Sequence, residues 1–306
     1  MQPSGLTYGV AGLDLPILPA ENPLQRILRS ALPDRMESVL TGVPYWNAAH
    51  FGLDRVSLFR EATLEQQQAM LTIASTQLLQ ESCAVEQAGM GYMTRMALLA
   101  ETLEERMLYS LFAADEATHL AQLQPFLPAA IVTPDPFLQL LTELAESSDK
   151  TVLLFMIQVL LEGWGLSHYR SLARDCSHPV LADRFREFLQ AEARHHATGV
   201  TLFRQTDLTR SSRSAILEIL VPFLQLVQPG PQRLVQAIAQ VQGDLSPSQR
   251  LQIFTELDTE THSGMRLQLL RSLMQSGGGG TIVQDLEEQG AFQPFSPEQC
   301  AHIAGG

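Results

Sequence analysis

The feature that most restricts the fold of this 306-residue chain is a motif that occurs twice at matched distances. Each copy is a Glu-x-x-His sequence, which places a carboxylate and an imidazole about one turn apart on one face of a helix. A further glutamate stands 30 residues before each copy. The two sets are Glu86, Glu116 and His119, and Glu162, Glu192 and His195.

The equal distances predict two helical hairpins. Two antiparallel helices joined by a short turn bring residues equidistant from that turn to the same height. The midpoints are residue 101, beside the helix-capping residue Thr102, and Ser177, in the Ser177-His178-Pro179 break. Fifteen residues at about 1.5 Å each would place all four glutamates roughly 22 Å from the turns.

Four carboxylates at one buried level are costly unless cations neutralise them. Two divalent ions would do so, with both histidines as neutral nitrogen ligands. Glu81 competes with Glu86 for the first position, but its midpoint with Glu116 falls in the apolar Leu98-Leu99 stretch. Its distance also has no twin in the second set, which favours Glu86.

Helical spacing and caps predict an all-α protein, with no segment of period two. Thr63 with Gln66, and Thr102 with Glu105, have capping-box spacing, and Asp135-Pro136 predicts another helix start. Pro125 ends the second helix and Pro179 opens a later one. The expected helices cover about 63–87, 102–124, 136–146, 152–175 and 179–206, followed by 212–227, 231–242 and 247–275.

Four regions follow from these signals. Residues 1–62 form an extension with one short helix at Pro23–Leu32, and 63–206 form the metal-binding bundle. Residues 207–275 add further helices. In the tail, 276–306, Gly277–Gly280 predicts a flexible joint before a capped turn at Ser296.

The pattern of Glu, Glu-x-x-His, Glu, Glu-x-x-His on four successive helices resembles the ferritin-like di-iron carboxylate superfamily. The resemblance covers about 63–206 and implies a ferritin-like four-helix bundle that binds two iron ions, with manganese/iron as the alternative. It implies that Glu116 and Glu192 bridge the ions and that His119 and His195 each bind one. Glu86 and Glu162 would be the remaining carboxylate ligands.

The segment from Glu162 to Tyr169 resembles the third ligand helix of cyanobacterial aldehyde-deformylating oxygenases. There a tyrosine seven residues after the glutamate lies near the metals, which implies a catalytic role for Tyr169; an ordinary core tyrosine is the alternative. Asp115 before Glu116 matches the aspartate that orients a histidine ligand, whereas Ala191 holds the equivalent place in the second set.

Gly89 and Gly165 each stand three residues after a ligand glutamate. Glycine inside a helix costs about 0.5–1 kcal/mol relative to alanine, so some benefit is expected. One explanation is close packing of helices. The other is a substrate pocket beside the metals, walled by neighbours such as Met93 and Trp164.

Charge and cysteine content limit the classes of partner that are expected for this chain. The net charge of −13, with Lys150 as the single lysine, disfavours nucleic acid. The residues Cys83, Cys176 and Cys300 form no C-x-x-C pair, so reduced thiols and an external electron donor, a ferredoxin or a reductase, are expected. Apolar runs are too short for a membrane span, and no signal pattern opens the chain; a cytoplasmic protein is the expectation.

The expected function is a di-iron oxygenase or oxidase that activates dioxygen to oxidise a small, apolar organic substrate. A rubrerythrin-like peroxidase with an external donor is the runner-up, since the cysteines cannot supply that family's own four-cysteine iron site. Iron storage and a bundle that keeps metal only for structure are the remaining alternatives. The sequence indicates neither the substrate nor the oligomeric state.

Overall fold

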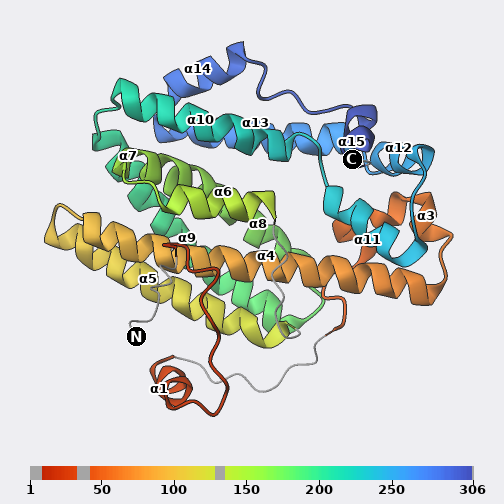
Figure 1. Cartoon of the computed structure of the whole chain (residues 1–306), viewed down its shortest axis with the longest axis horizontal. Helices are drawn as coiled ribbons and strands as arrows, with labels where there is room; N and C mark the ends of the chain where they lie inside the picture. Colours follow the sequence, from red (N-terminus) through yellow and green to blue (C-terminus); the bar gives the residue numbers. More distant parts are fainter. Residues whose placement is uncertain (1–8, 33–41, 128–134, 305–306) are drawn as a thin grey trace, which may run out of the picture. The chain divides into compact units, whose positions relative to one another are not determined.

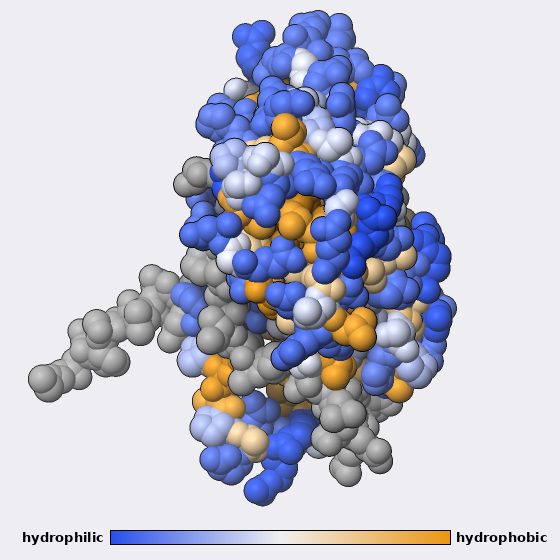
Figure 2. All heavy atoms as spheres, turned by 90° about the vertical axis from the view of Figure 1, so that its right-hand side faces the viewer, coloured by the Kyte–Doolittle hydropathy of each residue, from blue (hydrophilic) through white to orange (hydrophobic). Residues whose placement is uncertain are grey.

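The computed structural model describes residues 9–32, 42–127 and 135–304. Within these ranges the secondary structure is helical, with turns and one isolated bridge between Trp46 and Cys176 but no named strand. The all-α prediction is confirmed. Figure 2 shows one face of the molecule, where hydrophilic residues predominate and apolar residues are interspersed.

The chain forms two compact units. Unit 1 comprises Met1–Thr41 and Leu79–Lys150, and unit 2 comprises Gly42–Leu78 and Thr151–Gly306. The long helix α4 (Leu64–Leu99) begins in unit 2 and ends in unit 1. These boundaries cross the region 63–206, so the division into a bundle and flanking regions stays a prediction.

Unit 1 is built on a helical hairpin. The end of α4 lies beside α5 (Leu103–Leu123), and the turn between them occupies residues 100–102, as expected (Figure 1). Thr102 Oγ1 accepts a hydrogen bond from Glu105 N at 3.1 Å, which confirms this cap. The Lys150 ammonium lies 2.6 Å from Glu105 Oε1. The other described elements of the unit are α1 (Pro23–Ala31), η2 (Gln124–Phe126) and α6 (Pro136–Ala145).

Unit 2 contains the second predicted hairpin. Helix α8 (Glu162–Asp175) and α9 (Pro179–Gln205) pack together, and the chain turns at residues 176–178. His178 caps α9, because its Nδ1 accepts a hydrogen bond from Leu181 N at 3.4 Å. The remaining elements are α2 (Ala48–Phe51), η1 (Leu53–Arg55), α3 (Ser57–Arg60), α10 (Arg210–Val227), α11 (Gln232–Gln242), α12 (Pro247–Glu256), α13 (Thr259–Gly277), α14 (Gly280–Glu288) and α15 (Pro297–Ile303).

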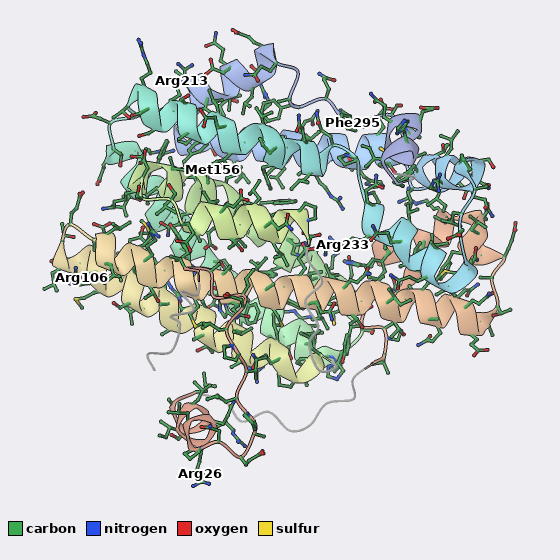
Figure 3. All side chains as sticks on the ribbon, in the orientation of Figure 1. Arg26, Arg106, Met156, Arg213, Arg233 and Phe295 are labelled. Carbon is green, nitrogen blue, oxygen red and sulfur yellow. The ribbon has the colours of Figure 1, made fainter. Side chains whose placement is uncertain are left out.

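A π-helix precedes α8 and was not predicted. After the short α7 (Lys150–Leu153), the π-helix η3 spans Leu154–Leu161, with the labelled Met156 inside it (Figure 3). Glycines let other segments approach it closely: a Cβ on Gly199 would lie 2.2 Å from Gln158 Cβ, and one on Gly277 would lie 2.3 Å from Val159 Cγ1. These contacts hold the wider helix on two sides.

Three helix boundaries differ from the predictions. α4 continues to Leu99, beyond the expected end near residue 87. Gly91 within it leaves room for the backbone of Val10, whose carbonyl oxygen would lie 1.8 Å from an added Cβ. The segment 247–275 is two helices, because Asp258 adopts a left-handed conformation with φ of 49°. At Gly277–Gly280, α13 ends with Gly278 as its C-cap, and α14 begins at Gly280 after a short turn.

One continuous helical stretch, Lys150–Asp175, is long and apolar enough to cross a membrane by length and composition. However, 56% of its apolar window is buried inside the protein. Core helices of soluble proteins have the same properties, so the stretch is weak evidence for a membrane span.

Candidate metal centre

The first half-site, in unit 1, consists of Glu86 on α4 with Glu116 and His119 on α5. All three are buried, and one ligand atom of each lies within 4.8 Å of the others. His119 Nδ1 is 3.0 Å from Glu86 Oε2 and 3.9 Å from Glu116 Oε2. The short contact across the hairpin selects Glu86 rather than Glu81. This buried group of two carboxylates and an imidazole could hold a metal ion.

Two neighbours close this half-site. A Cβ on Gly89 would lie 2.9 Å from Glu116 Oε2, so glycine leaves room for that carboxylate against α4. Cys83 lies one turn before Glu86 and is buried. Burial, together with the charge of Glu86, raises the pKa of the Cys83 thiol. The thiol therefore stays protonated and packs as a small apolar side chain, as expected.

The second half-site, in unit 2, consists of Glu162 at the start of α8 with Glu192 and His195 on α9. One ligand atom of each again lies within 4.8 Å of the others. His195 Nδ1 is 3.4 Å from Glu192 Oε2 and 3.9 Å from Glu162 Oε2. His195 is fully buried, whereas the Glu162 side chain retains 11% of its exposure. This group too could hold a metal ion.

Gln158 of the π-helix supports the second half-site from behind. Its Nε2 donates a 3.0 Å hydrogen bond to the backbone carbonyl of His195. Its own carbonyl lies 2.9 Å from Nδ1 of His196. The next residue after the ligand is thus used to fasten α9 to η3, which explains His196 without a role in metal binding. Sequence reasoning missed Gln158, because nothing local distinguishes it inside an apolar run.

The remaining predicted site residues differ in what surrounds them. Tyr169 is buried, and its ring stacks on Phe185 with centroids 5.5 Å apart. Trp164 packs edge-on against Phe223 of α10, at 5.7 Å. A Cβ on Gly165 would meet no atom within 4 Å, unlike one on Gly89.

Two further predicted residues lie in unit 1, in addition to those already described. Met93 is fully buried on α4. Asp115 is partly buried, and the hydrogen bond of His119 described above goes to Glu86 rather than to Asp115. The orienting role of Asp115 and the pocket roles of Met93, Trp164, Gly89 and Gly165 stay predictions.

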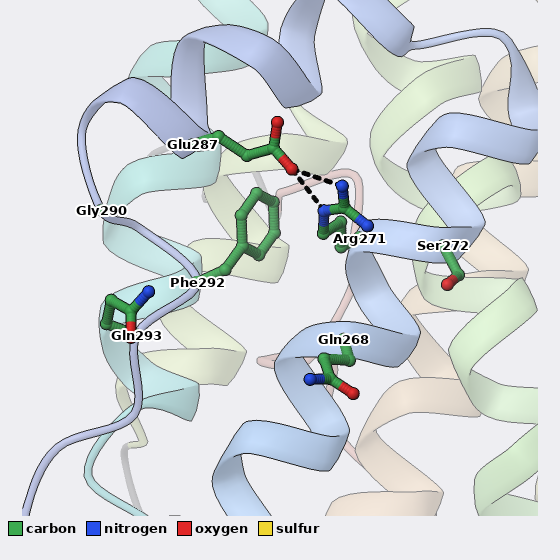
Figure 4. A pocket seen from close by; sticks show the side chains of 7 residues that line it. All are labelled: Gln268, Arg271, Ser272, Glu287, Gly290, Phe292 and Gln293. Carbon is green, nitrogen blue, oxygen red and sulfur yellow. Dashed lines mark hydrogen bonds and ion pairs between the residues drawn. The ribbon is translucent and has the colours of Figure 1, made fainter.

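A hollow of about 520 Å³ lies in unit 2, away from these residues. Figure 4 shows the Arg271–Glu287 ion pair and Phe292 at its walls, on α13, α14 and the segment after α14. It contains none of the candidate ligands and none of the predicted pocket residues. It therefore gives no support to a substrate chamber beside the half-sites.

A second cluster of polar groups in unit 2 was not anticipated. His50 Nδ1 lies 3.0 Å from Asp175 Oδ2, and the ring of His50 stacks on Trp46. Burial, together with the charges of Arg266 and His50, lowers the pKa of His168 to about 4. These residues come from three separate parts of the chain, so no local motif could have indicated the cluster.

Comparisons with protein-family models, with curated proteins and with solved structures find no match for this chain.

Proposed function

We propose that the chain is a dimetal oxidoreductase in which the two half-sites together hold two metal ions, most simply iron. The observation that carries the proposal is the matched pair: each unit contributes one Glu, Glu-x-x-His group whose ligand atoms lie within 4.8 Å of one another, and all six residues but the partly buried Glu162 are buried. A chance surface cluster would have no reason to be buried twice, in the same residue order and with the same 30-residue spacing.

Charge supports a stoichiometry of two. Each half-site has two carboxylates and one imidazole, so a single divalent cation neutralises it. Without a cation, buried carboxylates must be protonated or paired. His119 offers such pairing in the first half-site through its 3.0 Å contact with Glu86. In the second, His195 Nδ1 lies 3.4 Å from Glu192 Oε2.

The roles of the ligands follow the resemblance to the di-iron carboxylate proteins. Glu116 and Glu192 would bridge the ions, while the histidines and the other two glutamates would each bind one ion. Bound iron would supply the redox chemistry with which dioxygen is activated. Manganese/iron would use the same ligands.

The protein would then act on a small, apolar organic substrate. Access to the second half-site is supported by the space at Gly165, three residues after Glu162. No atom lies within 4 Å of a Cβ added at Gly165. Tyr169, buried among Phe185 and Phe188 on the same helical hairpin, would be the catalytic side chain beside the metals. Electrons would come from an external ferredoxin or reductase, and the cytoplasm would be the compartment.

Peroxide reduction is the second candidate function. It is favoured by the packing of Gly89 against Glu116 and by the position of the 520 Å³ hollow away from the ligands. A small oxidant such as peroxide needs no apolar chamber. Oxygen uptake stimulated by an apolar substrate separates the two functions from peroxide consumption that proceeds with a reductant alone.

The metal proposal is tested by counting ions. Protein from iron-replete cells should contain about two ions per chain. If the half-sites form one centre, Glu116→Ala should remove most of both ions, because a bridging carboxylate serves both. Two independent sites would instead leave about one ion in Glu116→Ala. Full occupancy in the Glu116→Ala, Glu192→Ala double variant would refute the ligand assignment.

A further inference from the structure

Residues 14–31 of unit 1 form an arm whose apolar side chains are uncovered. Its helix α1 presents Leu24, Ile27 and Leu28 on one face, at 61%, 62% and 50% exposure, and buries no residue. Leu15 and Ile17, before the helix, are also exposed. A nine-residue helix is marginal in water by itself, so its formation favours a partner surface.

The base of the arm, in contrast, is firmly held. Val10 N donates to Glu146 Oε1 at 2.5 Å, and Gln87 Nε2 donates to the carbonyl of Gly12 at the same distance. Ala11 is 1% exposed. The arm therefore leaves the unit from a fixed point.

Beyond this base, contacts are local. Within the described part of the arm, Gln25 Nε2 donates to Leu18 O, and Arg29 donates to Ala20 O and Gln25 O. These hydrogen bonds fold the arm upon itself. They leave the apolar face of α1 available to another surface.

A matching surface exists on the same unit. The outward face of α5 carries Leu103, Met107 and Leu111, which are 69%, 57% and 62% exposed and spaced one turn apart. They span nine residues, about 13 Å of helix, which equals the nine-residue length of α1. Exposed apolar stripes of this kind are uncommon on monomeric proteins.

From these two surfaces we infer that the chain pairs with a second copy of itself, each copy laying α1 along the α5 stripe of the other. A two-fold symmetric exchange covers both apolar faces at once, and the same contact is made twice. Charge agrees: α1 carries Arg26 and Arg29, whereas the exposed charged residues beside the stripe are Glu101 and Glu104 against one arginine, Arg106.

A membrane is the other class of surface that an amphipathic helix can bind. Electrostatics disfavours it, because the chain has a net charge of −13 and would be repelled by anionic headgroups. The α5 stripe would also remain uncovered. The second copy accounts for both surfaces, and the inference does not depend on the proposed metal chemistry.

The first experiment measures mass by light scattering at about 50 µM chain. The wild-type protein should have twice the 33.8 kDa mass of one chain. Ile27→Glu and Met107→Glu should each give the single-chain mass. Ser30→Glu adds the same charge to the polar side of α1 and should leave the dimer intact. A single-chain mass for the wild type would overturn the proposal.

The second experiment identifies the contact, in a Cys176→Ser background because Cys83 and Cys300 are buried. Ile27→Cys and Met107→Cys chains are mixed and oxidised. A disulfide between the two different chains is expected. If a chain carrying both cysteines forms only an internal disulfide, α1 folds onto its own α5 and the exchange is refuted.

Binding to lipid vesicles tests the membrane as the alternative partner of α1. Binding of the wild type to vesicles of equal phosphatidylglycerol and phosphatidylcholine, lost in Ile27→Glu and accompanied by a single-chain mass, would assign α1 to the membrane and overturn the proposal. Metal content should be the same in wild type, Ile27→Glu and Ser30→Glu. This readout keeps a failed exchange distinct from a failed metal site.

Discussion

The two half-sites each contain two glutamates and one histidine at the same spacing, yet they are held in different ways. In the first, Glu86 is bonded to His119 at 3.0 Å and Gly89 packs on Glu116. In the second, Glu162 follows a π-helix and is 3.9 Å from His195. Space adjoins Gly165 rather than a ligand. The repeated pattern determines which atoms could bind metal, and the surrounding residues determine how rigidly those atoms are held.

This difference has a mechanistic meaning. A π-helix is often found at functional sites because its backbone pairing is less regular than that of an α-helix. Under the proposed function, a substrate or oxidant would approach at the second half-site.

Metal removal should produce the largest effect. An ion at a thousand times its dissociation constant stabilises the folded state by about 4 kcal/mol. Chelation should therefore lower the melting temperature, and hydrogen exchange should accelerate more in α8 and η3 than in α5, because the 3.0 Å contact between His119 and Glu86 can hold the first half-site together without an ion. The Glu116→Ala, Glu192→Ala variant should show no such change. Equal acceleration in both halves would remove the contrast.

Acid should distinguish the units next. Unit 1 has His119 as its single histidine, and the other seven of eight lie in unit 2. Burial, Arg266 and His50 lower the pKa of His168 to about 4, below the unfolded value of about 6.5. The unfolded state binds more protons between these values. Stability is therefore full above pH 6.5 and falls as the pH drops towards 4.

Urea unfolding of metal-free protein at pH 7 and pH 4.5 measures this loss. The wild type should lose about 2–3 kcal/mol more than His168→Gln between the two pH values. Carboxylates also titrate in this range, and the difference between the two proteins removes their contribution. Equal losses would show that His168 does not have a lowered pKa in the folded state.

Local sequence signals predicted much of the fold. The predicted caps at Thr63, Thr102, Asp135 and Ser296 are present, because each depends on a side chain that bonds backbone groups two or three residues away. The hairpin turns fall at the predicted midpoints for the same reason. The two groups of candidate ligands were also chosen from the sequence, since Glu-x-x-His spacing places both side chains on one face of a helix.

Long-range contacts explain what was not predicted. The run Leu154–Leu161 is apolar throughout, so its periodicity could not distinguish a π-helix from an α-helix. The glycines that hold it, Gly199 and Gly277, come from distant parts of the chain. Likewise, α4 continues through Gly91 rather than ending before it, and the backbone of Val10, distant in sequence, packs against that glycine. The pairing of Glu86 with His119 depends on how α4 and α5 face each other, which spacing along the chain does not determine.

A pair of glutamines tests the support of the second half-site. Gln158→Leu removes the hydrogen bond to the His195 carbonyl and should destabilise the protein by about 1–2 kcal/mol. Metal affinity should fall about tenfold, because the ligand-bearing turn loses its anchor. Gln87→Leu is the matched control. Its side chain donates to the carbonyl of Gly12 at the base of the arm, so metal affinity should be unchanged. Equal metal affinity in both variants would exclude a positioning role for Gln158.

The smallest change, one methyl group at either glycine, sharpens the comparison most. In Gly89→Ala the added Cβ would lie 2.9 Å from Glu116 Oε2, the movable end of a side chain. The fold should therefore survive while the carboxylate shifts, and metal affinity should drop about tenfold. In Gly165→Ala the methyl group meets open space, so helix stability should rise by about 0.5–1 kcal/mol with both ions retained.

Larger side chains extend this test to function. Gly165→Leu should keep both ions but abolish oxygen consumption stimulated by an apolar substrate, if that space is where the substrate enters. Gly165→Ser, which adds little volume, is the control and should retain activity. If Gly165→Leu keeps full substrate-stimulated uptake, the substrate does not approach past α8. A peroxidase acting on a small oxidant then becomes the better account, because such an oxidant can reach the ions without that opening.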